Sequence, residues 1–443
     1  MACHRISPTD ALSTRDNKGR PSRRRNRAQP GWAARPRPAP TAPATIEQTN
    51  EVATAVIIDA VRTANGQRNG GLSGWHPAGL AAEVLRALEA RNGLDAALVE
   101  DVIMGCVTQI GAQSGNVARQ AVLAAGWPDS VPGTTVDRQG GSGQQALHFA
   151  AQGVLAGAYD VVVAAGVEIM SLVPPGAAIS QALGSPFGPE VERRFADRGG
   201  MMPLGHAAEL LASQWGQSRA ELDAWALRSH QRAAAATAAG HFDRELVEVR
   251  VHRAHRSGRA GPATLRVDEG IGDADSASLA AHQPTFTAGG VITAGNSAHV
   301  ADGASAALIM SEEKARELRL TPRARFVSFA VAAVDPILAL TGPVAATGLL
   351  LARAQLRIED IDLFEINEAF AGVALAWQSQ FAADAAKLNV NGGAIALGDP
   401  LGSGGTRLLA TLLGALEHGG GRYGLQSMSA AGGVATALII ERF

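Results

Sequence analysis

Cysteine, aromatic residues and long apolar runs are scarce in this sequence, and each scarcity excludes a class of protein. Only Cys3 and Cys106 occur among 443 residues, with no Cys/His cluster, which excludes a disulfide scaffold and argues against a metal site. No apolar run approaches ~18 residues, so we expect no membrane span. Two isolated thiols fit a reducing compartment, and we expect a cytoplasmic protein.

Lysine is also rare, with three residues against 36 arginines, which indicates GC-rich coding and not a nucleic-acid partner. Residues 1–45 carry ten Lys or Arg and two Asp, a net charge of +8. Since the whole chain has a formal charge of −2, the rest carries −10. An acidic body gives no support for binding DNA or RNA.

Residues 1–50 differ in composition from everything that follows. They contain the run Arg23-Arg24-Arg25-Asn26-Arg27 and prolines at 36, 38, 40 and 43, a density that prevents an amphipathic helix. We interpret this stretch as a disordered Arg/Pro-rich tail, or as translated sequence upstream of the true start. An organelle-targeting segment is the alternative.

Hydrophobic patterning predicts an α/β protein built from two similar halves. Strands and helices alternate, which is typical of parallel βαβ units. From 174 to 292 prolines, glycines and irregular polar segments interrupt this pattern, which we interpret as an insertion that covers one face of the sheet. The predicted strands are 53–59, 101–105, 134–136, 160–165, 361–366 and 436–442, and the predicted helices are 78–91, 115–125, 142–156, 207–215, 219–238, 370–380 and 406–418.

Glycine, at 51 residues, concentrates in loops where backbone N–H groups could surround a ligand. The loop 135–143 turns from a strand end into a helix N-terminus, a place that favours a developing anion. The other loops of this kind are 295–303, 367–370, 391–402 and 424–433.

From about residue 53 to Phe443 the chain resembles the thiolase family, that is, 3-ketoacyl-CoA thiolases and acetyl-CoA acetyltransferases. The resemblance implies a thiolase fold, with two similar βαβ halves in a layered α-β-α-β-α core and an inserted loop domain. It divides the chain into 51–173 plus 293–319, 174–292 as the CoA-binding loop domain, and 320–443. The motifs that carry it are Ala60-Val61-Arg62-Thr63, Gly105-Cys106-Val107, Gly115–Gln120, Arg228–Arg232, Asn367–Phe370 and Asn389–Leu397.

Three positions depart from the family's pattern. Where thiolases have a nucleophilic cysteine, a histidine and a second cysteine, this sequence has Gly140, Asp399 and Ser429, with matching flanks on both sides. Gly140 has no atom that can accept an acyl group. Asp399 is a weak base at pH 7 unless it is desolvated, and a serine ionises far less readily than a thiol. We therefore predict that thiolysis and Claisen condensation are lost.

Each replacement also has a structural interpretation. Asp399 followed by Pro400 suits the N-cap and first position of the next helix. Gly140 could be a turn glycine, or could open the site to a different substrate. Ser429 could be a passive near-isostere.

Other site groups that the resemblance implies are retained. Asn367 corresponds to the asparagine that positions a water at the thioester oxygen, although it could also be a satisfied loop residue. The backbone N–H groups of Gly140 and Ala431 correspond to a second oxyanion hole. Gly295, Asn296, Ser297 and Ala298 correspond to the stretch that contacts coenzyme A, where Ala298 replaces the serine usually found beside the pantetheine arm.

Three functions remain open from the sequence. The chain could bind acyl-CoA without catalysis, with an active partner enzyme as one setting for that role. It could instead be an enzyme that carries out retro-aldol cleavage, decarboxylation or thioester hydrolysis without an acyl-enzyme. It could also be an acyltransferase with an unrecognised nucleophile. The resemblance implies a coenzyme A thioester as ligand or substrate, no permanently bound cofactor, and a homodimer or homotetramer.

Overall fold

The computed structural model describes residues 53–443 except 180–183 and 252–263, so the predicted tail at 1–50 lies outside the described residues. One mixed sheet runs through this part of the chain, with short side strands β2 (Gly66–Gln67) and β6 (Leu246–Val247). Its main strands, in spatial order, are β11 (Leu363–Ile366), β12 (Tyr423–Ala430), β13 (Val434–Arg442), β10 (Ala324–Ala333), β1 (Ala55–Thr63), β9 (Ala301–Ser311), β5 (Val161–Ile169), β3 (Asp101–Gly105) and β4 (Thr134–Val136).

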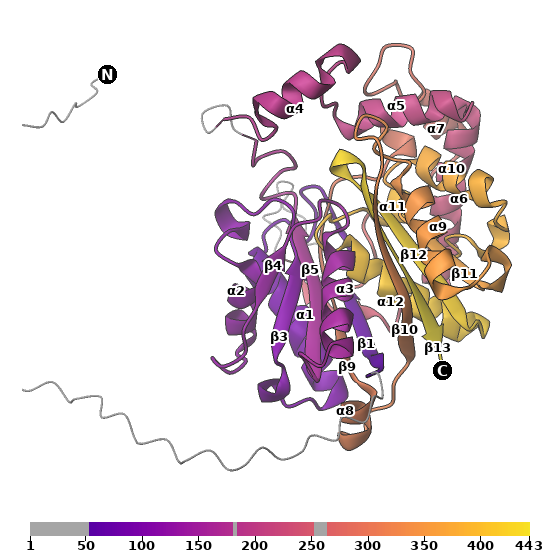
Figure 1. Cartoon of the computed structure of the whole chain (residues 1–443). Coiled ribbons are helices and arrows are strands. Elements are labelled where there is room, and N and C mark those ends of the chain that lie inside the picture. Colours follow the sequence, from indigo (N-terminus) through magenta and orange to yellow (C-terminus); the bar gives the residue numbers. More distant parts are fainter. Residues whose placement is uncertain (1–52, 180–183, 252–263) are drawn as a thin grey trace, which may run out of the picture. The chain divides into compact units, whose positions relative to one another are not determined.

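Helices cover both faces of this sheet (Figure 1). They are α1 (Pro77–Asn92), α2 (Val117–Ala125), α3 (Ser142–Leu155), α4 (Gly188–Phe195), α5 (Leu204–Gln214), α6 (Arg219–Ala238), α7 (Ser276–Ala281), α8 (Glu312–Glu317), α9 (Gly342–Ala354), α10 (Ala371–Phe381), α11 (Ala394–Leu397) and α12 (Gly404–Gly419).

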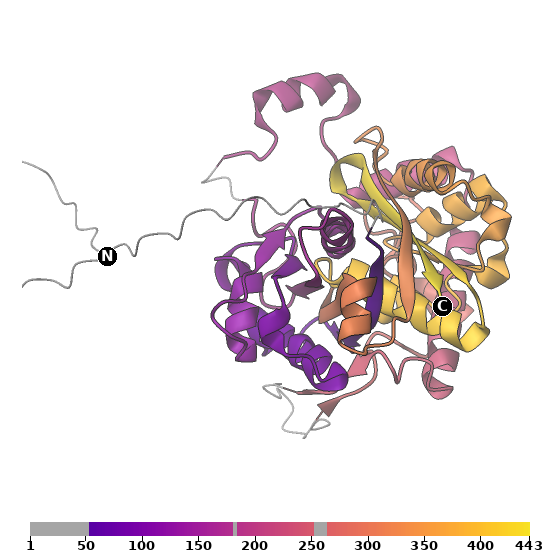
Figure 2. The same ribbon diagram turned by 60° about the horizontal axis from the view of Figure 1, so that its bottom comes forward.

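The two halves of the sheet separate because β1 and β10 pair at only two positions, Val56 with Arg325 and Ile57 with Ala324. Helices α3 and α12 fill the space between the halves and share one apolar core with strands of both. Figures 1 and 2 show the indigo-to-magenta half and the orange-to-yellow half on either side of this layer. The predicted α-β-α-β-α arrangement is confirmed.

The expectation of parallel βαβ units holds for only part of the sheet. Pairs β3–β4, β3–β5 and β11–β12 are parallel, whereas β1–β9, β5–β9, β10–β13 and β12–β13 are antiparallel. Strands β9 and β13, the last strand of each half, run against both of their neighbours, and β1 and β10, where the two halves meet, are antiparallel as well.

The segment 174–292 is irregular, as expected, and contains α4, α5, α6 and α7. Helix α6 begins where predicted because Ser218 and Glu221 form a capping box at its N-terminus. The boundaries proposed from the sequence for the two halves and the loop domain remain predictions.

Glycines bring the N-termini of α3 and α12 against each other. A Cβ at Gly405 would lie 2.0 Å from the backbone nitrogen of Gln144, and one at Gly143 would lie 2.8 Å from the carbonyl oxygen of Gly402. Only glycine permits such a close approach of two backbones. The loops that precede these two helices, which contain Gly140 and Asp399, are thereby held close together.

Candidate active site

Asp399 lies in the turn before α12 and is only 5 % exposed. Its Oδ2 accepts a hydrogen bond from Asn367 Nδ2 at 3.0 Å, while its Oδ1 has no partner in the part of the chain that the structure describes. The N-cap of α12 is Ser403, so the helix-cap interpretation of Asp399 is wrong. The error arose because Pro400 begins a separate turn, in which its carbonyl accepts from the N–H groups of Ser403 and Gly404.

Burial raises the pKa of the Asp399 carboxyl above its ordinary value. The hydrogen bond from Asn367 and the positive charge of Arg407 oppose this rise, as does His299. A desolvated carboxylate is a stronger base than one in water, which is the change that the sequence argument required of Asp399.

Gly140 lies just before α3, in a turn held by the Ser142 hydroxyl, which accepts from Arg138 N–H and donates to the Gln139 carbonyl. Its φ lies outside the left-handed region, so the backbone does not demand glycine here. A Cβ at this position would lie 3.3 Å from the Ser429 carbonyl oxygen and 3.9 Å from Leu401 Cδ2. A small side chain therefore fits after a slight adjustment.

Ser429 lies at the end of β12, next to the strand end that carries Asn367. Asn367 N–H donates to the Ser427 carbonyl at 3.0 Å, which fixes the two strand ends side by side. The Ser429 hydroxyl and the Asn367 Oδ1 are both buried and have no partner among the described residues. Gly140, Asn367, Asp399 and Ser429, far apart in sequence, thus lie around one place in the fold.

A cavity of 610 Å³ opens beside these residues. Gln139 and Ala431, near neighbours of Gly140 and Ser429 in the chain, form part of its wall. Most of the rest is apolar and comes from the segment 176–204, with Ile179, Phe187, Met201, Met202 and Leu204. A cavity of this size and lining suits an organic ligand with a large apolar part.

Two charged residues at the site were not identified from the sequence. Arg407, on the first turns of α12, is 1 % exposed, and no described residue forms a hydrogen bond with its Nε or Nη1. Glu365 on β11 is 2 % exposed, and burial raises its pKa to about 8. No sequence signal marks either residue, because an arginine in a helix and a glutamate in a short strand are usually solvated.

Cys106 is the only cysteine among the described residues, and it is fully buried. Burial raises the pKa of its thiol well above the ordinary range, and the nearby Glu168 carboxylate raises it further. Because the thiolate is the reactive form, Cys106 is a poor candidate for an unrecognised nucleophile.

The stretch predicted to contact coenzyme A is held in place by hydrogen bonds to neighbouring segments. Asn296 is fully buried: its Nδ2 donates to Asp223 and to the Val291 carbonyl, and its Oδ1 accepts from Thr293 N–H. Ala298 N–H donates to the Ala369 carbonyl, beside Asn367. A ligand role for Gly295, Asn296, Ser297 and Ala298 remains a prediction, and Asn296 would act through its support of the loop.

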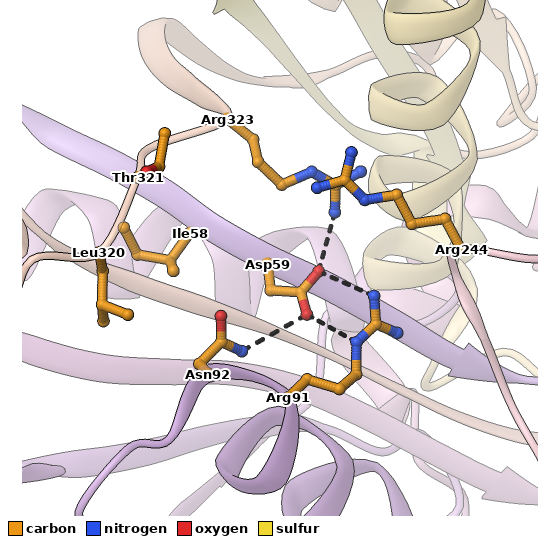
Figure 3. Close-up of a pocket in the computed structure, with 8 residues that line it drawn as sticks. All are labelled: Ile58, Asp59, Arg91, Asn92, Arg244, Leu320, Thr321 and Arg323. Carbon is orange, nitrogen blue, oxygen red and sulfur yellow. Dashed lines mark hydrogen bonds and ion pairs between the residues drawn. The ribbon is translucent and has the colours of Figure 1, made fainter.

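A second cavity, of 290 Å³, lies at the other end of β10 (Figure 3). Asp59 is its centre and pairs with Arg91 at 3.0 Å and with Arg323 at 2.8 Å. Arg323 precedes Ala324, whereas Ser429 pairs through Ala435 with Ala332, so about 26 Å of strand separates this cavity from Ser429. Arg244 and Arg323 also pair with Glu417, so the charges of this cavity are all engaged, and we interpret it as a structural ion-pair network.

Among the described residues, no helix is long and apolar enough to cross a membrane, and no group of His, Cys, Asp and Glu could hold a metal ion.

Comparisons with known proteins agree with the geometry. A family model described as the thiolase N-terminal domain matches residues 55–313, and one described as the thiolase C-terminal domain matches 320–442. A steroid 3-ketoacyl-CoA thiolase of Mycobacterium tuberculosis is 47 % identical over 394 residues, covering 88 % of this chain and 94 % of the relative. A 3-ketoacyl-CoA thiolase of Yersinia pestis is 43 % identical, covering 87 % and 99 %.

Solved structures are also similar. The crystal structure of an acetyl-CoA acetyltransferase of Bacillus anthracis is 37 % identical with a TM-score of 0.80, and the alignment covers 88 % of this chain and 99 % of that one. The crystal structure of human mitochondrial 3-ketoacyl-CoA thiolase is 34 % identical with a TM-score of 0.79, at the same coverage.

Proposed function

Because the chain belongs to the thiolase family, we propose that it binds an acyl-CoA thioester and acts on it without an acyl-enzyme, with Asp399 as general base. The observation that carries this proposal is a buried carboxylate with one unpartnered oxygen, held by Asn367 at the centre of the site.

Among the described residues of the site we find no reachable nucleophile, which supports a route without a covalent intermediate. Gly140 offers no side-chain atom, the Ser429 hydroxyl has no base bonded to it, and the Cys106 thiol is buried and protonated. These facts favour an enzyme that uses acid-base chemistry over an acyltransferase with an unrecognised nucleophile.

Retro-aldol cleavage of a 3-hydroxyacyl-CoA fits one base and a retained oxyanion site. Asp399 takes the proton of the C3 hydroxyl, the C2–C3 bond breaks, and its electron pair forms the thioester enolate. The protonated Asp399 then returns that proton to C2, which yields a carbonyl compound and a shorter acyl-CoA. Asn367 and the backbone N–H groups of Gly140 and Ala431 would stabilise the enolate oxygen.

The substrate would carry a bulky apolar acyl group. The large apolar wall of the 610 Å³ cavity supports this, as does the steroid substrate in the name of the relative from Mycobacterium tuberculosis. The stretch Gly295–Ala298 would lie along the coenzyme A arm. A homodimer or homotetramer in the cytoplasm is part of the same proposal.

A second candidate is an acyl-CoA-binding protein without turnover. One observation favours it: Asn367, Asp399 and Ser429 are each at most 5 % exposed, so a substrate must displace neighbouring atoms to reach them.

Mass analysis of products separates these functions. The purified protein is incubated with a bulky 3-hydroxyacyl-CoA alone, and separately with the matching 3-ketoacyl-CoA and CoA. A shorter acyl-CoA and a carbonyl compound from the first incubation support the proposal. Binding with no product in either supports the second candidate. Thiolysis products together with an enzyme-linked acyl group would overturn both.

A further inference from the structure

Arg407 is a buried cation without a direct partner. Among the described residues it forms no ion pair, and its Nε and Nη1 donate no hydrogen bond. A guanidinium has five N–H donors and stays charged in proteins, so burying it uncompensated is costly. Something in its surroundings must offset that charge.

The charges that face Arg407 come from four segments. Arg62 on β1 repels it, while Asp399 before α12, Glu365 on β11 and Asp268 attract it. Asp268 is already engaged by Arg62, at 2.7 Å and 3.0 Å. Burial raises the pKa of Glu365 to about 8 and also raises the pKa of Asp399, so titration does not distinguish these two carboxyls. Of the two, Asp399 is the carboxyl that lies against the helix that carries Arg407.

Asp399 is positioned for this role. Its Oδ1, the oxygen without a partner, lies against the first turn of α12, where a Cβ at Gly404 would be 2.8 Å from it. Arg407 follows Gly404 by three residues and so projects from the same face of the helix. The N-terminus of α12 adds positive potential at this point. Besides Arg407, the groups that face Asp399 are Asn367 and His299.

We propose that Arg407 is the counter-ion of Asp399, acting through space or through one water, and that it holds Asp399 as the carboxylate that can accept a proton. Arg407 is thus a positioning residue, and its catalytic consequence rests on the proposed function. The replacement of the family's histidine by an aspartate then places a negative charge where an unpaired positive charge is buried.

A double-mutant cycle tests this pairing without any need for turnover. The variants Asp399→Asn, Arg407→Gln and their combination are unfolded in denaturant at pH 7. We expect Asp399→Asn to lower the folding equilibrium constant at least fivefold more in the wild-type chain than in the Arg407→Gln background. Glu365→Gln is the comparison, because it removes an equally buried carboxyl that also attracts Arg407 but that the proposal does not make its counter-ion. Additive effects at 399 and 407, or coupling of Arg407 to Glu365 alone, would overturn the proposal.

Two further measurements keep the inference testable on its own. If Arg407→Gln does not fold, Arg407→Lys is used in its place. Stability is measured against pH, and the inflection that belongs to Asp399 is the one that Asp399→Asn abolishes. In Arg407→Lys this inflection should move upward by at least half a pH unit. An unmoved inflection counts against the pairing. Where turnover is found, the acid limb of its pH profile should move in the same direction. Coupling in a protein without turnover would leave this inference intact and refute only the proposed function.

Discussion

Two buried groups of charged residues in this molecule differ in how completely their polar atoms are hydrogen-bonded. Arg62, fully buried, is paired with Glu245 at 2.5 Å and with Asp268 at 2.7 Å, and Thr411 gives Glu245 a further hydrogen bond. At the candidate site, at least one buried polar atom of each key residue has no partner within the described ranges; these residues are Asp399, Asn367, Ser429 and Arg407. The Arg62 group is saturated, whereas the candidate site keeps free hydrogen-bonding capacity of the kind that a ligand or water can use.

The largest effect is expected when two cysteines and a histidine are placed at the positions in the candidate site where thiolases have them. The triple variant Gly140→Cys, Asp399→His and Ser429→Cys should show thiolysis of a 3-ketoacyl-CoA well above background, measured as CoA-dependent loss of substrate. Single reversals should do almost nothing, because residues of a catalytic unit act together and losing one can cost about 10⁶ in rate. A triple variant that folds and binds acyl-CoA but stays inactive would indicate that the pocket around Ala298 and the loop domain has diverged.

Breaking the saturated group should instead damage the fold. Arg62→Gln leaves Glu245 and Asp268 buried without their cation, and we expect a loss of about 3–5 kcal/mol in the free energy of unfolding. Denaturant titration measures it. Arg357→Gln, which removes an exposed pair with Asp360, is the control and should leave the unfolding midpoint unchanged. Equal effects of the two variants would refute the contrast.

Stability should fall as pH rises from about 5 to 8, because Glu365 is buried beside the site. Its pKa is raised from 4.5 to about 8, so the folded state binds this proton more tightly than the unfolded state. That contribution is complete below the unfolded pKa and is lost as pH rises through the folded one, by up to ~1.4 kcal/mol per pH unit. Glu365→Gln should flatten this dependence of stability on pH, measured by denaturant melts at several pH values. An unchanged slope would mean that the dependence comes from Asp399 or Glu245, whose pKa values burial also raises.

The smallest effect concerns two buried serines. Ser305 donates to the Ser403 carbonyl at 2.8 Å, whereas the Ser429 hydroxyl has no partner. We expect Ser305→Ala to cost about 1–2 kcal/mol and Ser429→Ala less than about 0.5 kcal/mol. Should Ser429→Ala prove the costlier change, its hydroxyl has a partner, such as a bound water, that the contrast above leaves out.

Most of the fold follows from the sequence because its strands are either β-branched or framed by family motifs. Predicted segments such as 101–105 and 134–136 match β3 and β4 to the residue. Strands β9, β10 and β12 were not predicted. Strand β9 is rich in alanine, and small residues carry no strand signal on their own. They are needed there because β9 is buried along its whole length and packs against helices on both faces.

The position of the candidate site could be predicted from the sequence, but the balance of its buried charges could not. Gly140, Asp399 and Ser429 were identified by flanking motifs, and the structure brings them together with Asn367. The helix-cap interpretation of Asp399 failed because the turn at Pro400 delays α12 until Gly404. Arg407 and Glu365 were missed because burial of a charge depends on long-range packing, which spacing along the chain does not reveal.

The role of Asp399 is tested most directly by Asp399→Asn, which keeps the shape of the side chain and removes its basicity. Turnover of a bulky 3-hydroxyacyl-CoA and affinity for the same compound are measured for both proteins. The account predicts that turnover falls at least about a hundredfold, as expected for a lost general base, while affinity stays within about threefold. Unchanged turnover in the Asp399→Asn protein would contradict it.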